Sequence, residues 1–149
     1  MLLAVGKLRP WYRAACDDYL GRIRRYGPIS EREIRAAGRA ATPALARKEE
    51  AGRLLAQLPA RVLVIALDRG GPAWSSEELA RRLARWREGA RPLALVIGGA
   101  EGLDSSALDR ADQRWSLGPL TLPHELARVV TLEQWYRAWT ILRGEPYHK

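Results

Sequence analysis

The sequence predicts an α/β fold with a mainly parallel sheet and helices on both faces. Short apolar runs that suit buried strands alternate along the chain with longer stretches of helical periodicity. The runs at 62–67 and 93–97 are continuously apolar, as in parallel strands that are covered on both sides. A chain of 149 residues is long enough for one core, so residues 1–149 are expected to form a single domain.

In the first half of the chain, strands and helices follow one another in turn. The expected elements are strands at 2–5, 29–36 and 61–67, and helices at 10–26 and 43–58. Pro10 suits the first turn of a helix, where a backbone N–H would have no partner. Thr42 and Pro43 are typical of an N-cap followed by the first helical residue, so they place the start of the second helix.

In the second half, a helix from Ser75 or Ser76 to about Gly89 is followed by a strand at 92–97. Glu77 and Glu78 in the first turn support that helix start, because carboxylates are favourable at the positive end of a helix. The segment 104–106, Asp-Ser-Ser, starts a short helix.

The chain is expected to finish with a short strand at 115–117 and a long helix. Pro123 opens this helix and Gly144 ends it. Trp135 and Trp139 are one turn apart, and we expect their rings to stack.

Two turns rich in Gly and Pro follow neighbouring predicted strands, at 98–102 and 117–123. The carboxyl ends of parallel strands are where an open α/β sheet usually places a ligand. The first turn lacks the spacing of a dinucleotide fingerprint or a P-loop, but its glycines let a ligand approach the backbone. The alternative is a tight turn that only reverses the chain.

The second turn is apolar from Leu117 to Leu122, although it lies between a strand and a helix and should be partly exposed. Such a loop suits a flat purine, which needs stacking and hydrogen bonds to its edge but no opposite charge. The alternative is that these leucines cap the core.

Positive charge is concentrated in the first third of the chain. The whole chain has a formal net charge of +8, and residues 1–48 hold eleven Lys+Arg against four Asp+Glu. This distribution indicates a polyanionic partner such as nucleic acid. A base-composition bias in the genome is an alternative reason for 22 Arg against 3 Lys, but it does not explain the asymmetry.

Other features point to the cytoplasm. The single cysteine, Cys16, excludes an internal disulfide and fits a reducing compartment. The apolar runs are too short to span a membrane, and the first residues show no leader pattern, so no membrane association is expected.

In its loops and C-terminal half the sequence resembles a known enzyme family, the 23S rRNA pseudouridine-1915 N3-methyltransferases (RlmH family) of the SPOUT superfamily. The matching segments run nearly from end to end. They are AVGK at 4–7, GPAWSSEE at 71–78, IGGAEG at 97–102, WSL at 115–117, LTLPH at 120–124, EQWYRA at 133–138 and PYHK at 146–149.

The resemblance implies a fold with a C-terminal trefoil knot, a homodimer, and S-adenosylmethionine held by three loops. Carried over to this sequence, the cofactor contacts fall on Leu67, Gly98, Leu117, Gly118, Pro119, Leu120, Thr121 and Leu122. These are the two loops described above together with the end of the strand at 61–67. Methyl transfer from a sulfonium needs in-line placement of the nucleophile and no metal ion, so no metal site is expected.

The resemblance also implies the substrate, N3 of pseudouridine 1915 in 23S rRNA, expected on the assembled ribosome. The N3 proton must leave before methylation, and His148 is the candidate general base, with Tyr147 positioning the target base. Arg137 is the candidate that stabilises negative charge on the neighbouring carbonyl oxygens. The alternatives are a SPOUT enzyme acting on another RNA such as tRNA, and a non-catalytic RNA-binding protein.

Overall fold

A computed structural model describes residues 1–38, 42–89 and 91–148, apart from the side chain of His148. Its sheet has five strands, all parallel, in the order β2-β1-β4-β3-β5. The strands are β1 Leu2–Val5, β2 Glu31–Ile34, β3 Leu63–Leu67, β4 Leu93–Ile97 and β5 Gln113–Trp115. The predicted parallel α/β sheet is therefore confirmed, with β2 and β5 as edge strands.

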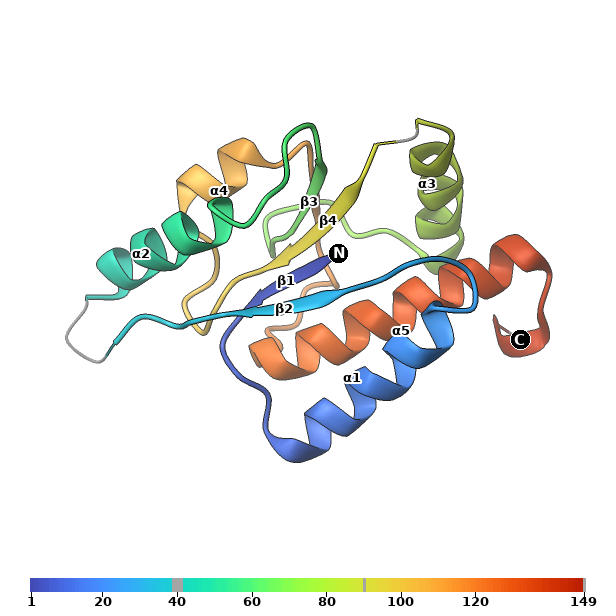
Figure 1. The fold of residues 1–149 in the computed structure, drawn as a ribbon, viewed down its shortest axis with the longest axis horizontal. Helices are drawn as coiled ribbons and strands as arrows, with labels where there is room; N and C mark the ends of the chain where they lie inside the picture. Colours follow the sequence, from blue (N-terminus) through green and yellow to red (C-terminus); the bar gives the residue numbers. More distant parts are fainter. Residues whose placement is uncertain (39–41, 90, 149) are drawn as a thin grey trace.

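Helices cover both faces of this sheet (Figure 1). They are α1 Pro10–Ile23, α2 Pro43–Leu55, α3 Ser76–Glu88, α4 Ser105–Arg110 and α5 His124–Arg143, followed by a 3₁₀ turn, η1 Pro146–His148. On one face α5 packs between α1 and α3, and on the other α2 packs against α4. No helix in the described ranges is long and apolar enough to cross a membrane. The trefoil knot stays a prediction, because strand order does not establish how the chain threads.

Side chains of the central strands alternate between two cores, as the period of two in a strand requires. Leu2 and Ala4 join the core under α1, α3 and α5, whereas Leu3 and Val5 join the core under α2. Cys16 is fully buried in the first of these cores. Burial on both faces explains why the central strands are continuously apolar in sequence.

Three predicted helix starts are confirmed by capping hydrogen bonds. The Thr42 hydroxyl accepts from the N–H of Leu45 at 3.3 Å, and the Ser75 hydroxyl accepts from Glu78 at 3.1 Å. The Asp104 carboxylate accepts from the N–H of Ser106 at 3.0 Å. Each bond satisfies an N–H group that has no partner within its own helix.

The first two helices end three residues before their predicted ends, at Ile23 and Leu55. The residues that follow form tighter i→i−3 bonds, such as the 2.9 Å bond from the N–H of Tyr26 to the carbonyl of Ile23. Pro28 and Pro59 then prevent continuation, because proline disfavours helical geometry in the residue before it.

The predicted stacking of Trp135 on Trp139 is wrong. Trp135 stacks on Trp86 of α3, with ring centroids 6.1 Å apart, and Trp139 stacks on Tyr26 at 5.4 Å. Because α5 lies between two helices, its large side chains find ring partners on those neighbours and not on each other.

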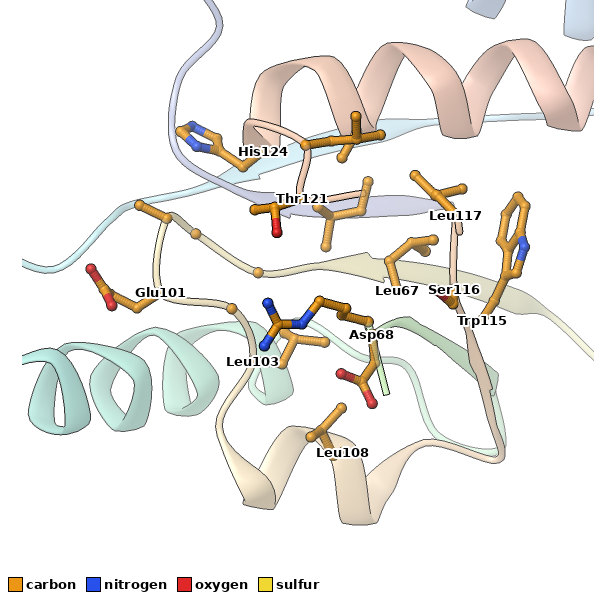
Figure 2. A pocket seen from close by; sticks show the side chains of 18 of the residues that line it. Leu67, Asp68, Glu101, Leu103, Leu108, Trp115, Ser116, Leu117, Thr121 and His124 are labelled. Carbon is orange, nitrogen blue, oxygen red and sulfur yellow. The ribbon is translucent and has the colours of Figure 1, made fainter. Parts of the chain in front are cut away.

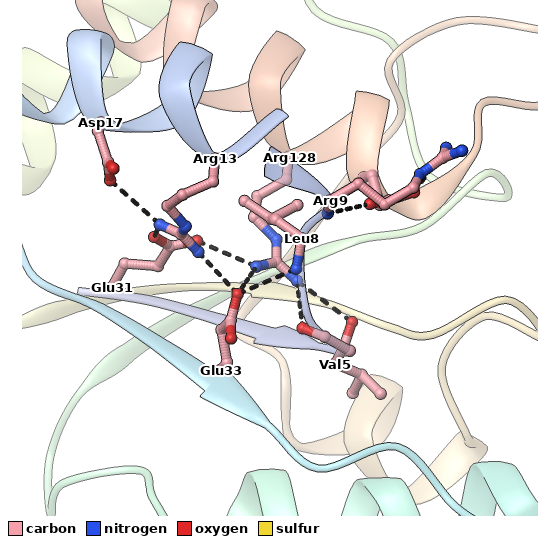
Figure 3. Close-up of polar contacts among 10 residues, drawn as sticks. Val5, Leu8, Arg9, Arg13, Asp17, Glu31, Glu33 and Arg128 are labelled. Atoms are coloured by element: carbon pink, nitrogen blue, oxygen red, sulfur yellow. Dashed lines mark hydrogen bonds and ion pairs between the residues drawn. The ribbon is translucent and has the colours of Figure 1, made fainter. Parts of the chain in front are cut away.

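A fully buried arginine, Arg128 of α5, holds the end of β1 and the edge strand β2 (Figure 3). Its guanidinium lies 3.1 Å from carboxylate oxygens of both Glu31 and Glu33. It also donates to the carbonyl of Val5 at 3.3 Å and to that of Gly6 at 2.8 Å. One side chain therefore ties a helix to two parallel strands where the chain leaves β1.

Arg13 of α1 completes this cluster from the other side. It pairs with Glu31, with Glu33 at 2.7 Å and with Asp17 at 3.2 Å. Burial alone would raise the pKa of Glu33, but hydrogen bonds from Arg13 and from the N–H of Leu8 lower it below its ordinary value. Glu33 therefore remains ionised, and the two carboxylates share two arginines, which offsets the cost of burying charge.

Replacing Arg128 tests how strongly the fold depends on this cluster. We expect Arg128→Met to lower the free energy of unfolding by about 3–5 kcal/mol, because it leaves buried acceptors without their partner. Arg81→Met is the matched control: it removes only an exposed pair with Glu78 and should change stability by less than about 1 kcal/mol. Equal effects of the two variants in urea unfolding would contradict a structural role for Arg128.

Candidate functional site

Three adjacent parallel strands end at the same level of the sheet. In the register of the sheet Leu67, the last residue of β3, pairs with Ile97, the last residue of β4. It also pairs with Trp115, the last residue of β5. The loops that follow the three strands therefore start at the same end of the sheet, and they enclose a cavity of about 1000 Å³ (Figure 2).

Seven of the eight predicted cofactor-binding residues line this cavity. They are Leu67, Gly98, Leu117, Gly118, Leu120, Thr121 and Leu122. Pro119, the eighth, is exposed and lies outside the lining. The structure thus brings together three loops that are far apart in sequence.

The loop after β4 is folded so tightly that it excludes a side chain at Gly98. A Cβ atom there would lie 2.5 Å from the carbonyl carbon of Gly102, and 2.6 Å from its oxygen. The N–H of Gly102 closes the turn on the carbonyl of Gly99 at 3.1 Å. The segment is therefore a tight turn that also forms a wall of the cavity.

The strand β5 ends at Trp115, two residues before its predicted end, because Ser116 turns the chain. Its hydroxyl accepts from the N–H of Gly118 at 3.2 Å and lies 3.1 Å from the carbonyl of the same residue. Gly118 has φ +112°, which an L side chain rarely adopts. Beyond it Leu120 is 75% exposed, whereas Leu117 packs against the core, so only part of the loop caps the core.

The loops after β3 and β5 are joined to each other by backbone bonds. The N–H of Asp68 donates to the carbonyl of Trp115 at 3.0 Å, and the N–H of Ser116 donates to that of Pro72 at 2.9 Å. Two walls of the cavity thus continue the parallel pairing of the sheet beyond its strands.

The lining of the cavity combines apolar and charged side chains. Leu67, Leu103, Leu108 and Leu117 supply its apolar lining. The charged lining residues are Arg47, Asp68, Arg69, Glu101 and Asp104. A hydrogen bond from the Ser106 hydroxyl lowers the pKa of Asp104 below its ordinary value, so this carboxylate is ionised at neutral pH. The site therefore suits a ligand with a flat apolar part and a charged tail.

The start of α5 is fixed beside the cavity by Glu125. The backbone N–H of Arg9 donates to one oxygen of this carboxylate at 2.7 Å, and the Arg9 side chain donates to the other at 2.8 Å. The backbone bond is the main reason why the pKa of Glu125 is lowered. His124, which precedes it, lines the cavity.

Two of the three predicted catalytic residues lie together at the opposite end of α5. The Tyr147 hydroxyl donates to Glu133 at 3.2 Å and lies 3.4 Å from the Tyr19 hydroxyl. Arg137 donates to the same Glu133 oxygen at 2.7 Å, and its guanidinium lies 4.9 Å from the centre of the Tyr147 ring. Burial raises the pKa of Tyr147, so its phenol stays protonated and can act only as a neutral group at neutral pH.

His148 belongs to η1, but its side chain lies outside the part of the chain that the structure describes. The cluster of Arg137 and Tyr147 is separated from the cavity by most of a helix. His124 and Arg137 are thirteen residues apart on α5, which corresponds to about 20 Å along its axis. The structure therefore does not bring the predicted catalytic and cofactor-binding residues of one chain together.

Sequence reasoning missed several residues of the cavity. Asp68 and Arg69 directly follow β3. Their place at the carboxyl end of a strand is the same signal that indicated the other two loops. Leu108 in α4 and Arg47 in α2 reach the cavity from helices on the other face of the sheet, and no local sequence signal indicates them. No group of three or more His, Cys, Asp or Glu within the described residues is arranged to hold a metal ion.

Comparison with known proteins shows that a chain with this fold and cavity belongs to the methyltransferases. A family model described as "Predicted SPOUT methyltransferase" matches residues 1–148. The chain therefore belongs to the SPOUT methyltransferase family, which confirms the resemblance seen in the sequence.

Individual relatives match over almost their whole length. A protein of Rubrobacter xylanophilus named "Ribosomal RNA large subunit methyltransferase H" is 52% identical, with 99% of this chain and 96% of the relative covered. Proteins of the same name from Solidesulfovibrio magneticus and an Anaeromyxobacter species are 51% and 50% identical, with 96% and 97% of the relative covered. The similarity therefore extends over the sheet, the cavity and the C-terminal helix.

The tight turn at Gly98 predicts a specific sensitivity to added volume. Gly98→Ala should lower the free energy of unfolding by about 1–3 kcal/mol, because its Cβ meets backbone that has no room to move. Gly52→Ala in α2, where a Cβ meets nothing within 4 Å, should be neutral or slightly stabilising. Wild-type behaviour of Gly98→Ala in thermal unfolding would contradict the described turn.

Proposed function

We propose that this methyltransferase transfers a methyl group from S-adenosylmethionine to N3 of pseudouridine 1915 in 23S rRNA, on the assembled ribosome. The observation that carries the proposal is the cavity formed by the loops after β3, β4 and β5 in a chain of the SPOUT methyltransferase family. The names of the relatives support a large-subunit rRNA as the substrate. A protein acting on ribosomes is expected in the cytoplasm.

The cavity has the properties that S-adenosylmethionine requires. Its volume of about 1000 Å³ accommodates a nucleoside with an amino-acid tail. The leucines of its lining suit the adenine ring, and the carboxylates of its lining complement the positive charge of the sulfonium and ammonium groups. The proposed contacts are Leu67, Gly98 and the loop from Leu117 to Leu122, including Pro119.

The proposed chemistry is a single displacement at the methyl carbon. His148 takes the proton of N3, the nitrogen lone pair forms the new bond to the methyl group, and the carbon–sulfur bond breaks to leave a neutral thioether. Arg137 stabilises negative charge on the adjacent carbonyl oxygens while the proton is absent. Tyr147, held neutral by burial, orients the target base through its ring and hydroxyl.

A second copy of the chain is part of this proposal. His124 at the cavity and Arg137 beside the tail of the same chain are about 20 Å apart along the axis of α5, which is too far for methyl transfer between them. A two-fold dimer in which the tail of one chain reaches the cavity of the other removes this separation. We therefore propose a homodimer with composite active sites.

Contacts to RNA phosphates are assigned to the basic first third. Within it Arg13 and Arg22 are engaged by carboxylates of their own chain. The side chains of Arg24 and Arg25 are exposed and form no ion pair with any residue that the structure describes. These two arginines are the best placed of the four to neutralise phosphate.

Methylation of defined substrates tests the proposed function. Ribosomes that lack the methyl group should gain one at pseudouridine 1915 when incubated with the protein and S-adenosylmethionine, as measured by mass spectrometry of rRNA fragments. A variant that lacks residues 146–149 should bind S-adenosylmethionine in calorimetry as the wild type does, but transfer no methyl group. Methylation of tRNA alone would favour the alternative enzyme, and absence of cofactor binding would favour a non-catalytic RNA-binding protein.

Mixed dimers test the composite active site. Gly98→Val should remove cofactor binding, and deletion of 146–149 should remove the tail, so each homodimer should be inactive. A dimer with one subunit of each kind, purified through two different tags, should recover about half of the wild-type activity because one of its two sites is intact. An inactive mixed dimer would contradict a site built from two chains.

A further inference from the structure

A second, smaller cavity lies between α1, α3 and α5 at the amino ends of the central strands. Its volume is about 420 Å³, within the range of pockets that bind small ligands. Leu93 and Leu95 of β4 line it from the sheet, and Tyr26, Trp135 and Trp139 line it from the helical side. The cofactor cavity lies at the opposite ends of the same strands, so the two are separate.

The walls of this cavity are aromatic, and their edges reach the surface. Trp139 and Tyr26 stack in parallel, with planes 8° apart. Trp135 and Trp139 are almost fully buried, whereas Tyr26 is half-buried and the adjacent Pro28 is exposed. Such a pocket suits a flat ring that enters from solvent and stacks on aromatic side chains.

Positive charge lies at this cavity, because Arg87 and Arg91 are among its lining residues. The guanidinium of Arg87 lies 4.7 Å from the centre of the Trp139 ring and makes no ion pair with any described residue. Arg24 and Arg25 directly precede Tyr26 in the chain and are exposed. An aromatic pocket lined by Arg87, with two exposed arginines next to Tyr26 in the chain, is complementary to a base that is attached to phosphates, because the base stacks and the phosphates are neutralised.

The pocket also adjoins the C-terminal tail. The Tyr26 hydroxyl donates to the Glu145 carboxylate at 2.5 Å. Tyr136, whose ring lies 6.0 Å from that of Tyr26, packs edge-on against Tyr147 at 4.7 Å. A nucleotide in the pocket would therefore be one aromatic layer away from the residues that are proposed to hold the target base.

We propose that this cavity binds one unpaired base of the RNA substrate close to the nucleotide that is methylated. The inference rests on the proposed function and adds a specificity pocket to it. Stacking between Tyr26 and the base supplies affinity, while Arg87, Arg24 and Arg25 hold the flanking phosphates. The pocket thus selects RNA in which a base next to the target base can leave the RNA helix.

A matched pair of variants at Tyr26 tests the stacking. Tyr26→Leu and Tyr26→Phe both lose the bond to Glu145, but only Tyr26→Phe keeps the ring. We expect the KM for unmethylated ribosomes to rise about tenfold in Tyr26→Leu and to stay near the wild-type value in Tyr26→Phe. The dissociation constant for S-adenosylmethionine should be unchanged in both. Equal KM values for the two variants would overturn the proposal.

A second pair on α3 covers the case in which Tyr26→Leu does not fold. Arg87→Gln should raise the KM several-fold, whereas Arg81→Gln, which removes the same charge on the same helix where it pairs with Glu78, should not. Equal effects of these two variants would mean that only overall charge matters, which also overturns the pocket.

Photocrosslinking separates this inference from the proposed function. A single-stranded octaribonucleotide that carries one 4-thiouridine should crosslink to the peptide containing Tyr26 or to the segment 135–139. If ribosomes are methylated but crosslinks lie elsewhere, the pocket is wrong and the proposed function stands. If the crosslink forms but ribosomes are not methylated, the pocket stands and the proposed function fails. Crosslinks that vanish on dimerisation would show that a second copy covers the cavity, which contradicts the pocket.

Discussion

The site depends on one constraint. The strands β3, β4 and β5 all end at the same level of the sheet. Leu67 pairs with both Ile97 and Trp115, so three loops start from one edge of the sheet and surround one cavity. Parallel pairing is essential here, because antiparallel neighbours would send alternate loops to opposite edges. A shift of one strand by two residues would separate the loops and open the cavity.

The long helix α5 links the cavity to the C-terminal tail at the other side of the molecule. Its first turn is held at the cavity by Glu125 and Arg9, and its second turn is held at the end of β1 by Arg128. Its last turns carry Tyr136, which packs against Tyr147 of the tail, and Trp139, which stacks on Tyr26. Because these contacts lie along one rigid element, the positions of the cavity and the tail are fixed relative to each other within a chain. Their separation makes a second chain part of the proposed mechanism.

Local signals in the sequence were enough for the architecture. Apolar runs predicted the parallel strands, and Thr42, Ser75 and Asp104 predicted helix starts that the structure confirms with capping bonds. The loops at 98–102 and 117–123 were found because glycine and proline are conspicuous where a chain turns. Leu67 was predicted as a cofactor contact only from the family resemblance, because a leucine at the end of a buried strand has no distinguishing sequence pattern.

Tertiary contacts accounted for what sequence patterns did not predict. The partners of Trp135 and Trp139 come from α3 and from the turn after α1, and a helical period cannot show which neighbour a ring will meet. Arg128 is fully buried although its sequence gives no reason to separate it from the exposed arginines. Its burial depends on Glu31 and Glu33, which lie almost one hundred residues earlier in the chain.

Hydrogen exchange of the backbone, with and without S-adenosylmethionine, tests the central claim most directly. If the aligned strand ends form the cofactor site, the ligand should slow exchange together in three segments: the residues after Leu67, the turn at 98–103 and the loop at 116–122. Exchange in β2 should not change. Protection confined to a different part of the chain, or to only one of the three loops, would contradict a site built from the ends of β3, β4 and β5.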